Sequence, residues 1–324
     1  MEEGYITIAT NNNSKYVEMA LNLALSIKNK DKRPICLLTD NITEIPQGYK
    51  RYFNYIITIA PGDEIVGTLN KFLLFKYSPF QRTMYIDADS LMVKNDISFF
   101  WNALSGYNFT VVGGECRKGP WYGKEMKEII AKIGIPYMVA FTGAFIYFDK
   151  AEITAKVFEK AYEYYKNHKD TVSVPVDCGR LGRKEQYSDE PFFGVAMGFY
   201  NLKPIPDVFQ FKPQIRQPIL SSDKFSRFKY KIYKVDCLKG SCVLVGEDWH
   251  RRSPTILHFY GEPEPSYIYI REANRLRRHY GLPMIDIRQV QGNYGKPNSL
   301  FEVLKSRFRA VINSFLAMFI PRDI

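Results

Sequence analysis

The beginning of the chain contains two short apolar runs with an amphipathic stretch between them. Tyr5–Ala9 and Pro34–Thr39 are continuous enough in apolar side chains to predict buried β-strands. Between residues 15 and 28 the apolar positions recur at the spacing of an α-helix, and Ser14 is a candidate N-cap. A strand, a helix and a second strand in this order predict a right-handed βαβ unit with a parallel sheet.

The patterning continues along most of the remaining chain. It predicts strands at 55–59, 83–87, 109–113, 141–148 and in the stretch that leads from Thr255 to His258, and helices at 69–77, 95–104, 151–168 and from about residue 188. Polar stretches at 119–122 and 169–188 are predicted to be loops, and residues 203–252 to form hairpins and loops. We therefore expect an α/β fold in which residues 1–270 form one domain and residues 271–324 a basic C-terminal extension.

Polar residues follow several of the predicted strands. Thr10, Asp40 and the pair Asp87 and Asp89 each come at the end of an apolar run. Ligands of open α/β sheets bind beyond the carboxyl ends of the strands, so we expect these side chains to share one edge. Two carboxylates separated only by Ala88 suit a divalent cation, because like charges at a buried strand end are costly unless they are compensated. The same tripeptide also starts turns and caps helices, so the pattern alone leaves both interpretations open.

Composition limits the class of protein. The chain has 324 residues, of which 46% are hydrophobic and 15% aromatic, which is typical of a folded protein and excludes a disordered one. Its five cysteines are scattered and contain no Cys-x-x-Cys pair, so the sequence indicates neither a disulfide framework nor a zinc site. No apolar run approaches the length of a membrane span, and we expect no signal peptide before the first strand. We expect a cytoplasmic protein.

The net charge of +11 is concentrated at the end of the chain. Between Arg271 and Ile324 there are ten Lys and Arg against four Asp and Glu. Within this region, apolar residues recur at helical spacing between 300 and 320 with basic residues among them. Such a helix either packs on the core or binds an anionic membrane surface peripherally. No nucleic-acid recognition motif accompanies the charge, and a phosphate-bearing substrate would explain it equally well.

With these pieces in order, the chain resembles the GT-A glycosyltransferases, most closely the retaining family-8 group of glycogenin and lipopolysaccharide galactosyltransferases. The matching residues stand in the family's order: Ile6-Thr-Ile-Ala-Thr-Asn11, Asp40, Lys71, Tyr85-Ile-Asp-Ala-Asp-Ser90, Thr142-Gly143, Asp189-Glu190 and His258-x-x-Gly261. The Asp-x-Asp tripeptide alone is weak evidence, whereas the ordered set is strong. The resemblance implies a GT-A fold, which is a Rossmann-like nucleotide-binding mixed sheet flanked by helices.

The resemblance also implies a binding site for a UDP-sugar. The residues that would form it are Ala9, Thr10, Asn11, Asp40, Lys71, Ala88, Thr142, Gly143 and Gly261. Among them, Ala9, Thr10 and Asp40 would hold the uridine. Lys71 and Gly143 would contact the donor sugar or its diphosphate.

The resemblance to the family also implies a metal site. Asp87, Asp89 and His258 would ligate Mn²⁺ or Mg²⁺, and a histidine among oxygen ligands favours Mn²⁺ modestly. A metal at this place would act as the Lewis acid for the departing diphosphate.

The chain departs from the family at three points. Glu264 stands where the family has a diphosphate-binding Lys, so another basic residue substitutes or the grip on the diphosphate is weaker. Phe141-Thr-Gly143 replaces Asn-Ser/Ala-Gly, which removes an amide expected near the sugar. The family's Asp-Gln is here Asp189-Glu190, which adds a carboxylate beside Asp189, the residue that would contact the donor sugar. We hypothesise that Glu190 acts as a nucleophile or as an ion-pair stabiliser of an oxocarbenium-like transition state, by analogy with retaining glycosidases.

The sequence therefore predicts a metal-dependent glycosyltransferase that moves a hexose from a UDP-sugar to a hydroxyl acceptor on a glycan, glycolipid or protein, with retention. A nucleotidyltransferase is the alternative within enzymes, but the polar loop from Thr10 to Asn13 is not a Gly-rich phosphate loop. Outside enzymes, the alternative is a degenerate nucleotide-sugar-binding module, which the loss of the diphosphate-binding Lys makes conceivable.

Overall fold

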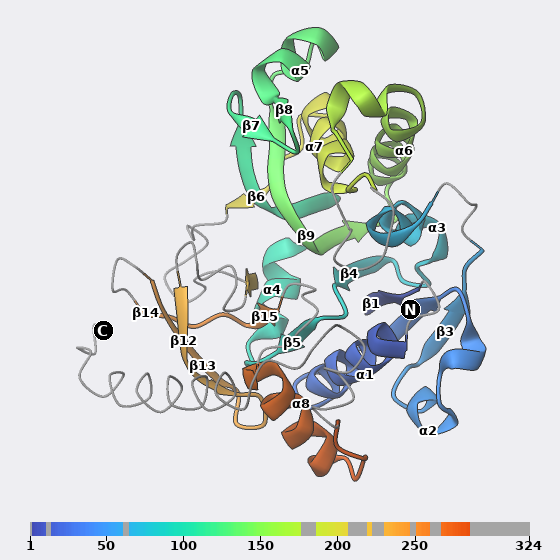
Figure 1. Cartoon of the computed structure of the whole chain (residues 1–324), viewed down its shortest axis with the longest axis vertical. Helices are drawn as coiled ribbons and strands as arrows, with labels where there is room; N and C mark the ends of the chain where they lie inside the picture. Colours follow the sequence, from blue (N-terminus) through green and yellow to red (C-terminus); the bar gives the residue numbers. More distant parts are fainter. Residues whose placement is uncertain are drawn as a thin grey trace, which may run out of the picture. The chain divides into compact units, whose positions relative to one another are not determined.

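The computed structural model of the chain describes residues 2–10, 14–60, 65–175, 186–206, 219–221, 230–246, 251–259 and 267–285 (Figure 1). These residues belong to two compact units. The first unit comprises Met1–Leu21, Lys32–Ala88 and Phe99–Gln210, and the second comprises Asn22–Asp31, Asp89–Ser98 and Phe211–Ile324. The division falls between Ala88 and Asp89, so it passes through the Asp-Ala-Asp tripeptide.

A seven-stranded mixed sheet forms the centre of the first unit, in the order β10-β6-β9-β4-β1-β2-β3. Its strands are β1 (Glu3–Ala9), β2 (Ile35–Thr39), β3 (Tyr55–Thr58), β4 (Arg82–Ile86), β6 (Phe109–Cys116), β9 (Met138–Asp149) and β10 (Ile205–Pro206). Strand β1 pairs in parallel with β2 and β4, and β2 with β3, whereas β9 runs antiparallel to β4 and β6. The sequence prediction of a parallel βαβ unit at the start of the chain is confirmed, and β9 makes the whole sheet mixed.

The helices that the apolar periodicity predicts are largely confirmed. They are α1 (Ser14–Lys28), α4 (Ile97–Leu104), α6 (Glu152–Val172) and α7 (Glu190–Phe199). The structure adds the shorter α2 (Gln47–Lys50) and α5 (Met126–Ile133), which the sequence did not predict. The helix predicted at 69–77 is instead a 3₁₀ segment, Gly67–Leu73, followed by a single turn, α3 (Leu74–Tyr77). The Asn70 side chain donates a hydrogen bond to the carbonyl oxygen of Gly67, and such local bonds compete with regular α-helical geometry.

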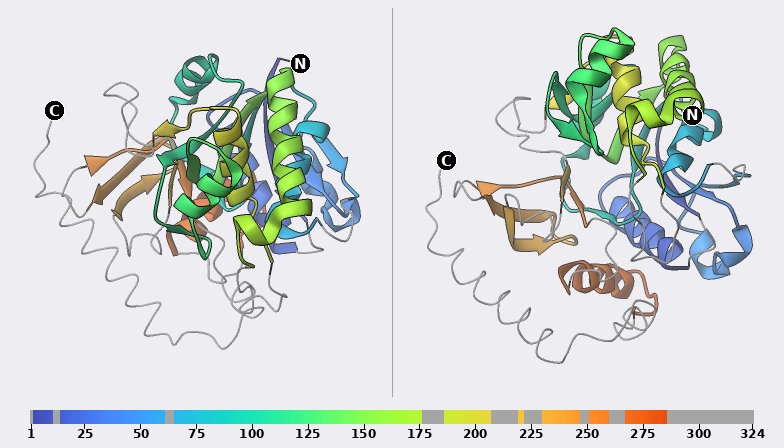
Figure 2. Two further views of the ribbon diagram at one scale, coloured as in Figure 1. Left: turned by 90° about the horizontal axis from the view of Figure 1, so that it is seen from above. Right: turned by 45° about the horizontal axis from the view of Figure 1, so that its top comes forward.

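Helices α6 and α7 lie side by side and enclose an aromatic core (Figures 1 and 2). The ring of Phe193 on α7 stacks on Phe109 at 5.6 Å between centroids and meets Phe158 on α6 at 5.2 Å. Two glycines allow α7 to approach β9 closely: a Cβ at Gly194 would lie 2.5 Å from the Val139 carbonyl oxygen, and one at Gly198 would lie 2.0 Å from the Tyr137 carbonyl oxygen. This close packing fixes the position of the residues at the start of α7.

Two predicted loops contain regular structure. Helix α6 has a kink at His168, whose backbone angles are non-helical (φ −139°, ψ 20°), so the regular helix is interrupted where the sequence predicts its end. A further helical turn follows the kink and ends at the fully buried Val172. The stretch 119–122 includes β7 (Pro120–Trp121), which pairs with β8 (Lys124–Glu125) in a small hairpin. Periodicity did not indicate either feature, since a two-residue strand has none. Residues 176–185 lie outside the described part of the chain.

The second unit contains a three-stranded sheet in the order β11-β15-β5 and an antiparallel sheet in the order β12-β13-β14. The strands are β5 (Ser90–Met92), β11 (Ile219–Ser221), β12 (Tyr230–Asp236), β13 (Ser241–Gly246), β14 (Arg251–Arg252) and β15 (Ile256–His258). Strand β15 pairs with β5 in antiparallel register, with His258 opposite Ser90. β15 confirms the predicted strand that ends at His258. Within the described residues, β12, β13 and β14 confirm the hairpins predicted for residues 203–252.

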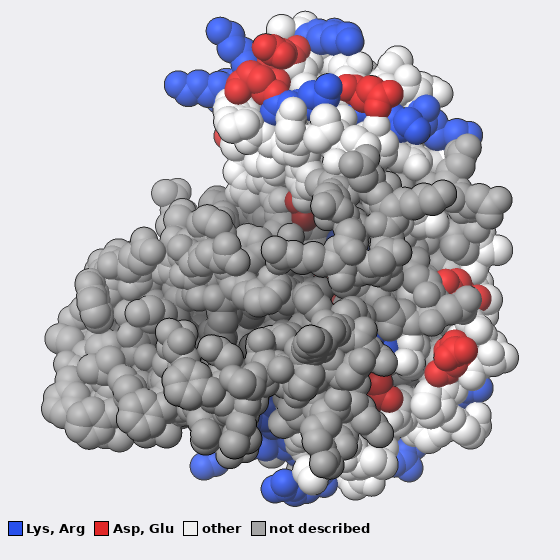
Figure 3. Space-filling view, viewed as in Figure 1, with Lys and Arg blue, Asp and Glu red and all other residues white. Residues whose placement is uncertain are grey.

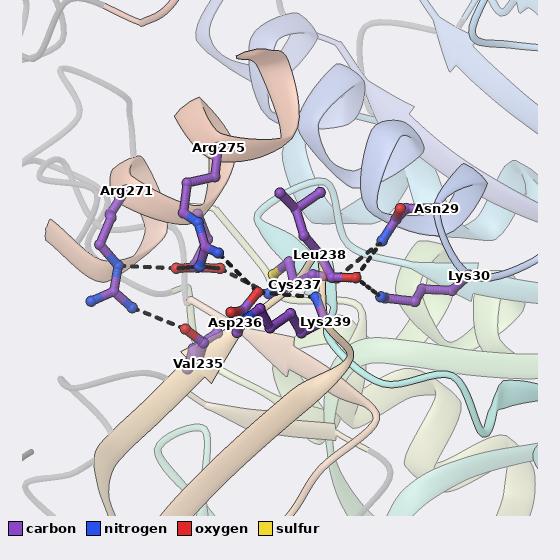
Figure 4. Close-up of polar contacts among 10 residues, drawn as sticks. Asn29, Lys30, Val235, Asp236, Cys237, Leu238, Lys239, Arg271 and Arg275 are labelled. Atoms are coloured by element: carbon purple, nitrogen blue, oxygen red, sulfur yellow. Dashed lines mark hydrogen bonds and ion pairs between the residues drawn. The ribbon is translucent and has the colours of Figure 1, made fainter. Parts of the chain in front are cut away.

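A polar cluster holds the turn between β12 and β13 (Figure 4). The fully buried Glu272, on α8 (Tyr267–His279), accepts a hydrogen bond from the backbone N–H of Cys237 at 2.8 Å. Arg275, one turn further along α8, forms an ion pair with Asp236 at 3.1 Å. From the end of α1, Lys30 donates to the carbonyl oxygen of Leu238 at 3.0 Å. These bonds join three segments of the second unit that are far apart in sequence.

Charged side chains of both signs intermingle on the described surface at the top of Figure 3. Within the part of the chain that the structure describes, no helix combines the length and the apolar composition that crossing a membrane requires. The basic helix predicted at 300–320 lies outside the described residues, and the predicted boundary at residue 270 stays a prediction.

Candidate functional site

Strands β1 and β2 bring two predicted uridine-binding residues to the same edge of the sheet. Ala9 pairs with Thr39 in parallel register, so Thr10 and Asp40 each follow one member of that pair. Thr10 is buried, and its Oγ1 accepts a hydrogen bond from the Asn70 side chain at 3.0 Å. Sequence reasoning missed Asn70, although a polar residue inside the apolar stretch around it is a detectable signal. Asn11 lies outside the described residues.

Strand β4 delivers Asp87 at its carboxyl end. The Asp87 backbone N–H donates to the Ala144 carbonyl oxygen at 3.0 Å, which continues the pairing of β4 with β9 past Ile86. The hydroxyl of Tyr85, which lies two residues earlier, donates a hydrogen bond to Asp87 Oδ1. The Asp87 side chain is 24% exposed and therefore accessible to a ligand.

Lys71 lies beside this carboxylate within the first unit. Its Nζ donates a hydrogen bond to the Gly143 carbonyl oxygen at 2.9 Å and lies 3.4 Å from Asp87 Oδ1 and 3.7 Å from Asp189 Oδ1. Burial by itself lowers the pKa of Lys71, but the negative charges of Asp189 and Asp87 outweigh burial and raise it. Lys71 is therefore a buried, permanently charged ammonium that joins three of the predicted site residues.

Position 143 requires a glycine because there is no room for a side chain, and not because of its backbone angles. A Cβ there would lie 2.7 Å from Lys71 Nζ, 3.2 Å from Asp189 Oδ2 and 3.2 Å from Glu190 Oε1. Real Cβ atoms rarely come this close to other atoms, so any larger residue would displace at least one of these charged groups. The preceding Thr142 is half-buried on the same strand.

Asp189 and Glu190 open helix α7, and helix capping does not explain the Asp189 side chain. Asp189 occupies the N-cap position but makes no side-chain capping bond, and neither of its carboxylate oxygens has a hydrogen-bond partner among the described residues. The residue is fully buried, and this burial raises the pKa of the Asp189 carboxyl to about 7. A buried carboxyl group that pairs with the ammonium of Lys71 and accepts no side-chain hydrogen bond from the described residues is an unusual structural element and a candidate ligand-binding group.

Glu190 differs from Asp189 in that both of its oxygens are bound. Oε1 accepts a hydrogen bond from the Gly143 backbone N–H at 2.7 Å, and Oε2 accepts one from the Tyr122 hydroxyl at 2.7 Å. Burial raises the pKa of Glu190, while these two donors act in the opposite direction. The half-buried carboxylate is therefore fixed in orientation.

Sequence reasoning missed Tyr122. It lies in the turn of the β7–β8 hairpin with a φ of 46°, which is the left-handed region that non-glycine residues rarely adopt and that costs about 1 kcal/mol or more. Burial and the neighbouring Glu190 both raise the pKa of Tyr122, so the hydroxyl keeps its proton and stays a donor. Gly119, Pro120 and Gly123 are the sequence features that mark this hairpin.

The second unit contributes Asp89 and His258. Asp89 Oδ1 lies 3.1 Å from His258 Nε2, and both side chains are buried, because β5 and β15 pair immediately beside them. The Asp89 carbonyl oxygen also accepts a hydrogen bond from the Phe259 N–H at 3.0 Å. Asp87, the third residue predicted to ligate a metal, belongs to the first unit, and only the buried Ala88 separates it from Asp89 along the chain. One nitrogen and two carboxylate ligands fit Mn²⁺ or Mg²⁺.

Gly261 and Glu264 lie outside the described residues.

Comparison with known proteins identifies solved structures that share the fold of this chain. No protein-family model and no curated protein sequence matches this chain. Among solved structures, the chain is similar to the galactosyltransferase LgtC, determined in complex with donor and acceptor sugar analogues, with a TM-score of 0.50 and 11% identity over 93% of this chain and 99% of LgtC. It is also similar to the bifunctional glycosyltransferase WbbM, with a TM-score of 0.52 and 11% identity over 90% of this chain and 52% of WbbM. The chain thus spans about half the length of WbbM.

These likenesses establish the class of fold. The mixed sheet and its flanking helices are those of the GT-A glycosyltransferases, as the resemblance to family 8 predicts. At 11% identity the likeness extends to the fold alone, and the function has to be argued from the site.

Proposed function

We propose that this protein is a metal-dependent glycosyltransferase that moves a hexose from a UDP-sugar to a hydroxyl acceptor. The observation that carries the proposal is the Asp87-Ala-Asp89 tripeptide at the end of β4, with Asp89 in contact with His258 and Asp87 in contact with Lys71. Paired carboxylates at the carboxyl end of a parallel strand suit a metal-bound diphosphate, and the buried Lys71 ammonium adds a second positive charge.

The nucleotide would bind where β1 and β2 end. In this proposal Thr10 and Asp40 hold the uridine, and the amide of Asn70 orients the Thr10 hydroxyl through their hydrogen bond. Ala9, the last residue of β1, provides backbone groups at the same edge. The parallel register of the two strands supports this assignment, because it delivers both side chains from neighbouring positions.

The metal ligands in this proposal are Asp87, Asp89 and His258. The bound ion, Mn²⁺ or Mg²⁺, would supply the Lewis acidity that neutralises the diphosphate leaving group. The fit rests on the chemistry of the group, since the contact between Asp89 and His258 joins an oxygen ligand and a nitrogen ligand in a buried place.

The sugar would lie near Lys71, Asp189 and Glu190. Asp189 is free to accept hydrogen bonds from sugar hydroxyls, because its oxygens lack hydrogen-bond partners among the described residues. Lys71 holds Asp189 in place and offsets its charge. Glu190, whose orientation is fixed, would stabilise positive charge at the anomeric carbon or attack it, which gives a retaining transfer.

The acceptor would carry a hydroxyl group on a glycan, a glycolipid or a protein. The basic residues beyond Arg271 suit an acceptor at an anionic membrane surface, with residues 300–320 as the segment that binds it peripherally. This part of the proposal rests on the sequence.

A donor panel tests the proposal. The full chain is incubated with Mn²⁺ and, separately, UDP-glucose, UDP-galactose and their N-acetyl forms, and both thermal stabilisation and UDP release are measured. A preferred donor should raise the melting temperature in a Mn²⁺-dependent way, because binding to the folded state stabilises it, and should release UDP. If none of the four donors causes a thermal shift or UDP release, in Mn²⁺ or in Mg²⁺, the proposal is contradicted. Binding without UDP release would indicate a binding module.

A further inference from the structure

Tyr122 is placed by a hairpin that is unusually constrained. Strands β7 and β8 pair Trp121 with Lys124, and the turn between them puts both Tyr122 (φ 46°) and Gly123 (φ 73°) in the left-handed region. The Tyr122 carbonyl oxygen accepts a hydrogen bond from the Val174 N–H at 3.1 Å. A Cβ at Gly123 would lie 2.4 Å from the Val174 side chain, so the turn is packed tightly against this residue.

The same hairpin is joined to helix α7 through Trp121. Its ring meets that of Phe141 on β9 at 6.3 Å, and a Cβ at Gly194 on α7 would lie 3.0 Å from the Trp121 ring. Gly194 is four residues after Glu190, which is one turn of the helix. The hairpin is therefore held against the helix that carries Glu190.

From this position Tyr122 reaches the carboxylate of Glu190. Its hydroxyl lies 2.7 Å from Oε2, while the Gly143 N–H lies 2.7 Å from Oε1 on the other side. A glutamate has three rotatable side-chain bonds, and two donors from separate elements fix the plane of its carboxylate. Removal of one donor would leave one oxygen of this half-buried carboxylate unsatisfied, and the side chain would rotate to find another partner.

We propose that Tyr122 is a positioning residue that holds the Glu190 carboxylate in the orientation needed for glycosyl transfer. The inference rests on the proposed function, in which Glu190 faces the anomeric carbon. The strained backbone of Tyr122 agrees with such a role, since strain of this kind persists where the surrounding structure enforces it and recurs at functional sites.

Tyr122→Phe removes the hydroxyl and keeps the ring that meets Trp121 at 5.5 Å. With Mn²⁺ and the preferred UDP-sugar, kcat for UDP release should fall about 10- to 100-fold while KM for the donor stays nearly constant, because a misplaced catalytic group affects the transition state more than binding. Tyr49→Phe is the matched control, since the Tyr49 hydroxyl also donates to a carboxylate, Glu18 Oε1 at 3.0 Å, and should leave kcat unchanged.

A double-mutant cycle separates positioning from general damage. If Tyr122 acts through Glu190, then Tyr122→Phe added to Glu190→Gln should cause little further loss of kcat. Losses that multiply in the double variant, or a Tyr122→Phe variant with full kcat, would overturn the inference.

A second readout does not depend on activity. The Gly143 amide donates to the Glu190 carboxylate, so its proton resonance reports the position of that carboxylate. In Tyr122→Phe this resonance should move upfield, and in Tyr49→Phe it should not. If the wild-type chain releases UDP from no donor, the proposed function fails. In that case an unmoved Gly143 amide in Tyr122→Phe overturns the inference as well.

Discussion

The ammonium of Lys71 donates a hydrogen bond to the carbonyl oxygen of Gly143 at 2.9 Å, and the absence of a side chain at Gly143 makes this contact possible. The two residues are 72 positions apart in sequence. Through this bond the 3₁₀ segment that carries Lys71 is fixed to strand β9, and the ammonium is held near the carboxylates of Asp87 and Asp189. The geometry of the candidate site therefore depends on a glycine that has no chemistry of its own.

Gly143→Ala should disrupt this arrangement. The new methyl group would come within 2.7 Å of Lys71 Nζ and would displace it from its three partners. We expect a loss of about 1 to 3 kcal/mol in the free energy of unfolding, as for other overpacked sites, together with weaker donor binding. Urea unfolding and the thermal shift with donor and Mn²⁺ measure the two effects.

Gly114→Ala is the matched control, because nothing lies within 4 Å of a Cβ built at that position on β6. It should change stability by only a few tenths of a kcal/mol and leave donor binding intact. Equal effects of the two substitutions on stability and donor binding would show that the position of Lys71 does not depend on the absence of a side chain at Gly143.

Asp189 should make stability depend on pH. Burial raises the pKa of its carboxyl from 3.8 to about 7 in the folded protein. In the unfolded chain the group loses its proton near pH 4, whereas in the folded protein it keeps the proton until near pH 7. The folded protein is therefore favoured by this group below pH 4 and progressively loses that advantage between pH 4 and 7, by up to about 4 kcal/mol.

Asp189→Asn removes this titration. Measured by urea unfolding in the absence of divalent metal, its free energy of unfolding relative to wild type should rise as the pH increases from 5 to 8. The comparison between the two proteins cancels the titration of other groups. Parallel pH profiles would mean that Asp189 titrates at an ordinary carboxyl pKa.

The sequence predicted most of the first unit because its elements follow local rules. Continuous apolar runs give β1 and β2, and the spacing of apolar side chains gives α1, since burial of one face decides both. The helical turn that follows the kink at His168 and ends at the buried Val172 was not predicted, because the polar stretch that forms it has no apolar period of its own. Mixed pairing around β9 was not predictable from local pattern, because pairing direction depends on long-range contacts.

The site was predictable where its residues end strands or match the family's order. Asp87, Asp89 and His258 belong to this kind. Tyr122 and Asn70 do not, because their roles come from contacts with residues 68 and 60 positions away, respectively. Such contacts exist only once the sheet and its helices have assembled.

Asp89→Asn should abolish metal-dependent donor binding while the protein stays folded. The substitution removes the negative charge next to His258 and relieves repulsion between the neighbouring carboxylates, so stability should be unchanged or slightly higher. UDP with Mn²⁺ should then give no thermal shift in the variant and a clear shift in the wild type.

Asp96→Asn provides the control in the same segment, because Asp96 is bound by Lys94 and by the Thr255 hydroxyl rather than by His258. This variant should keep its response to UDP and Mn²⁺. An Asp89→Asn protein that fails to fold, judged by circular dichroism, would indicate that the tripeptide is structural.

Glu190→Gln tests whether the negative charge beside Asp189 takes part in the reaction. Glutamine has nearly the same shape, and its carbonyl oxygen can still accept a hydrogen bond from either the Gly143 N–H or the Tyr122 hydroxyl, so the fold should persist. With metal and donor saturating, we expect kcat for UDP release to fall by about 100-fold or more, because the neutral amide neither attacks the anomeric carbon nor stabilises its positive charge. Single-turnover measurements, which isolate the chemical step from product release, give the relevant rate. Transfer at the wild-type rate would exclude a nucleophilic or ion-pairing role and would leave Glu190 as a structural partner of Gly143 and Tyr122.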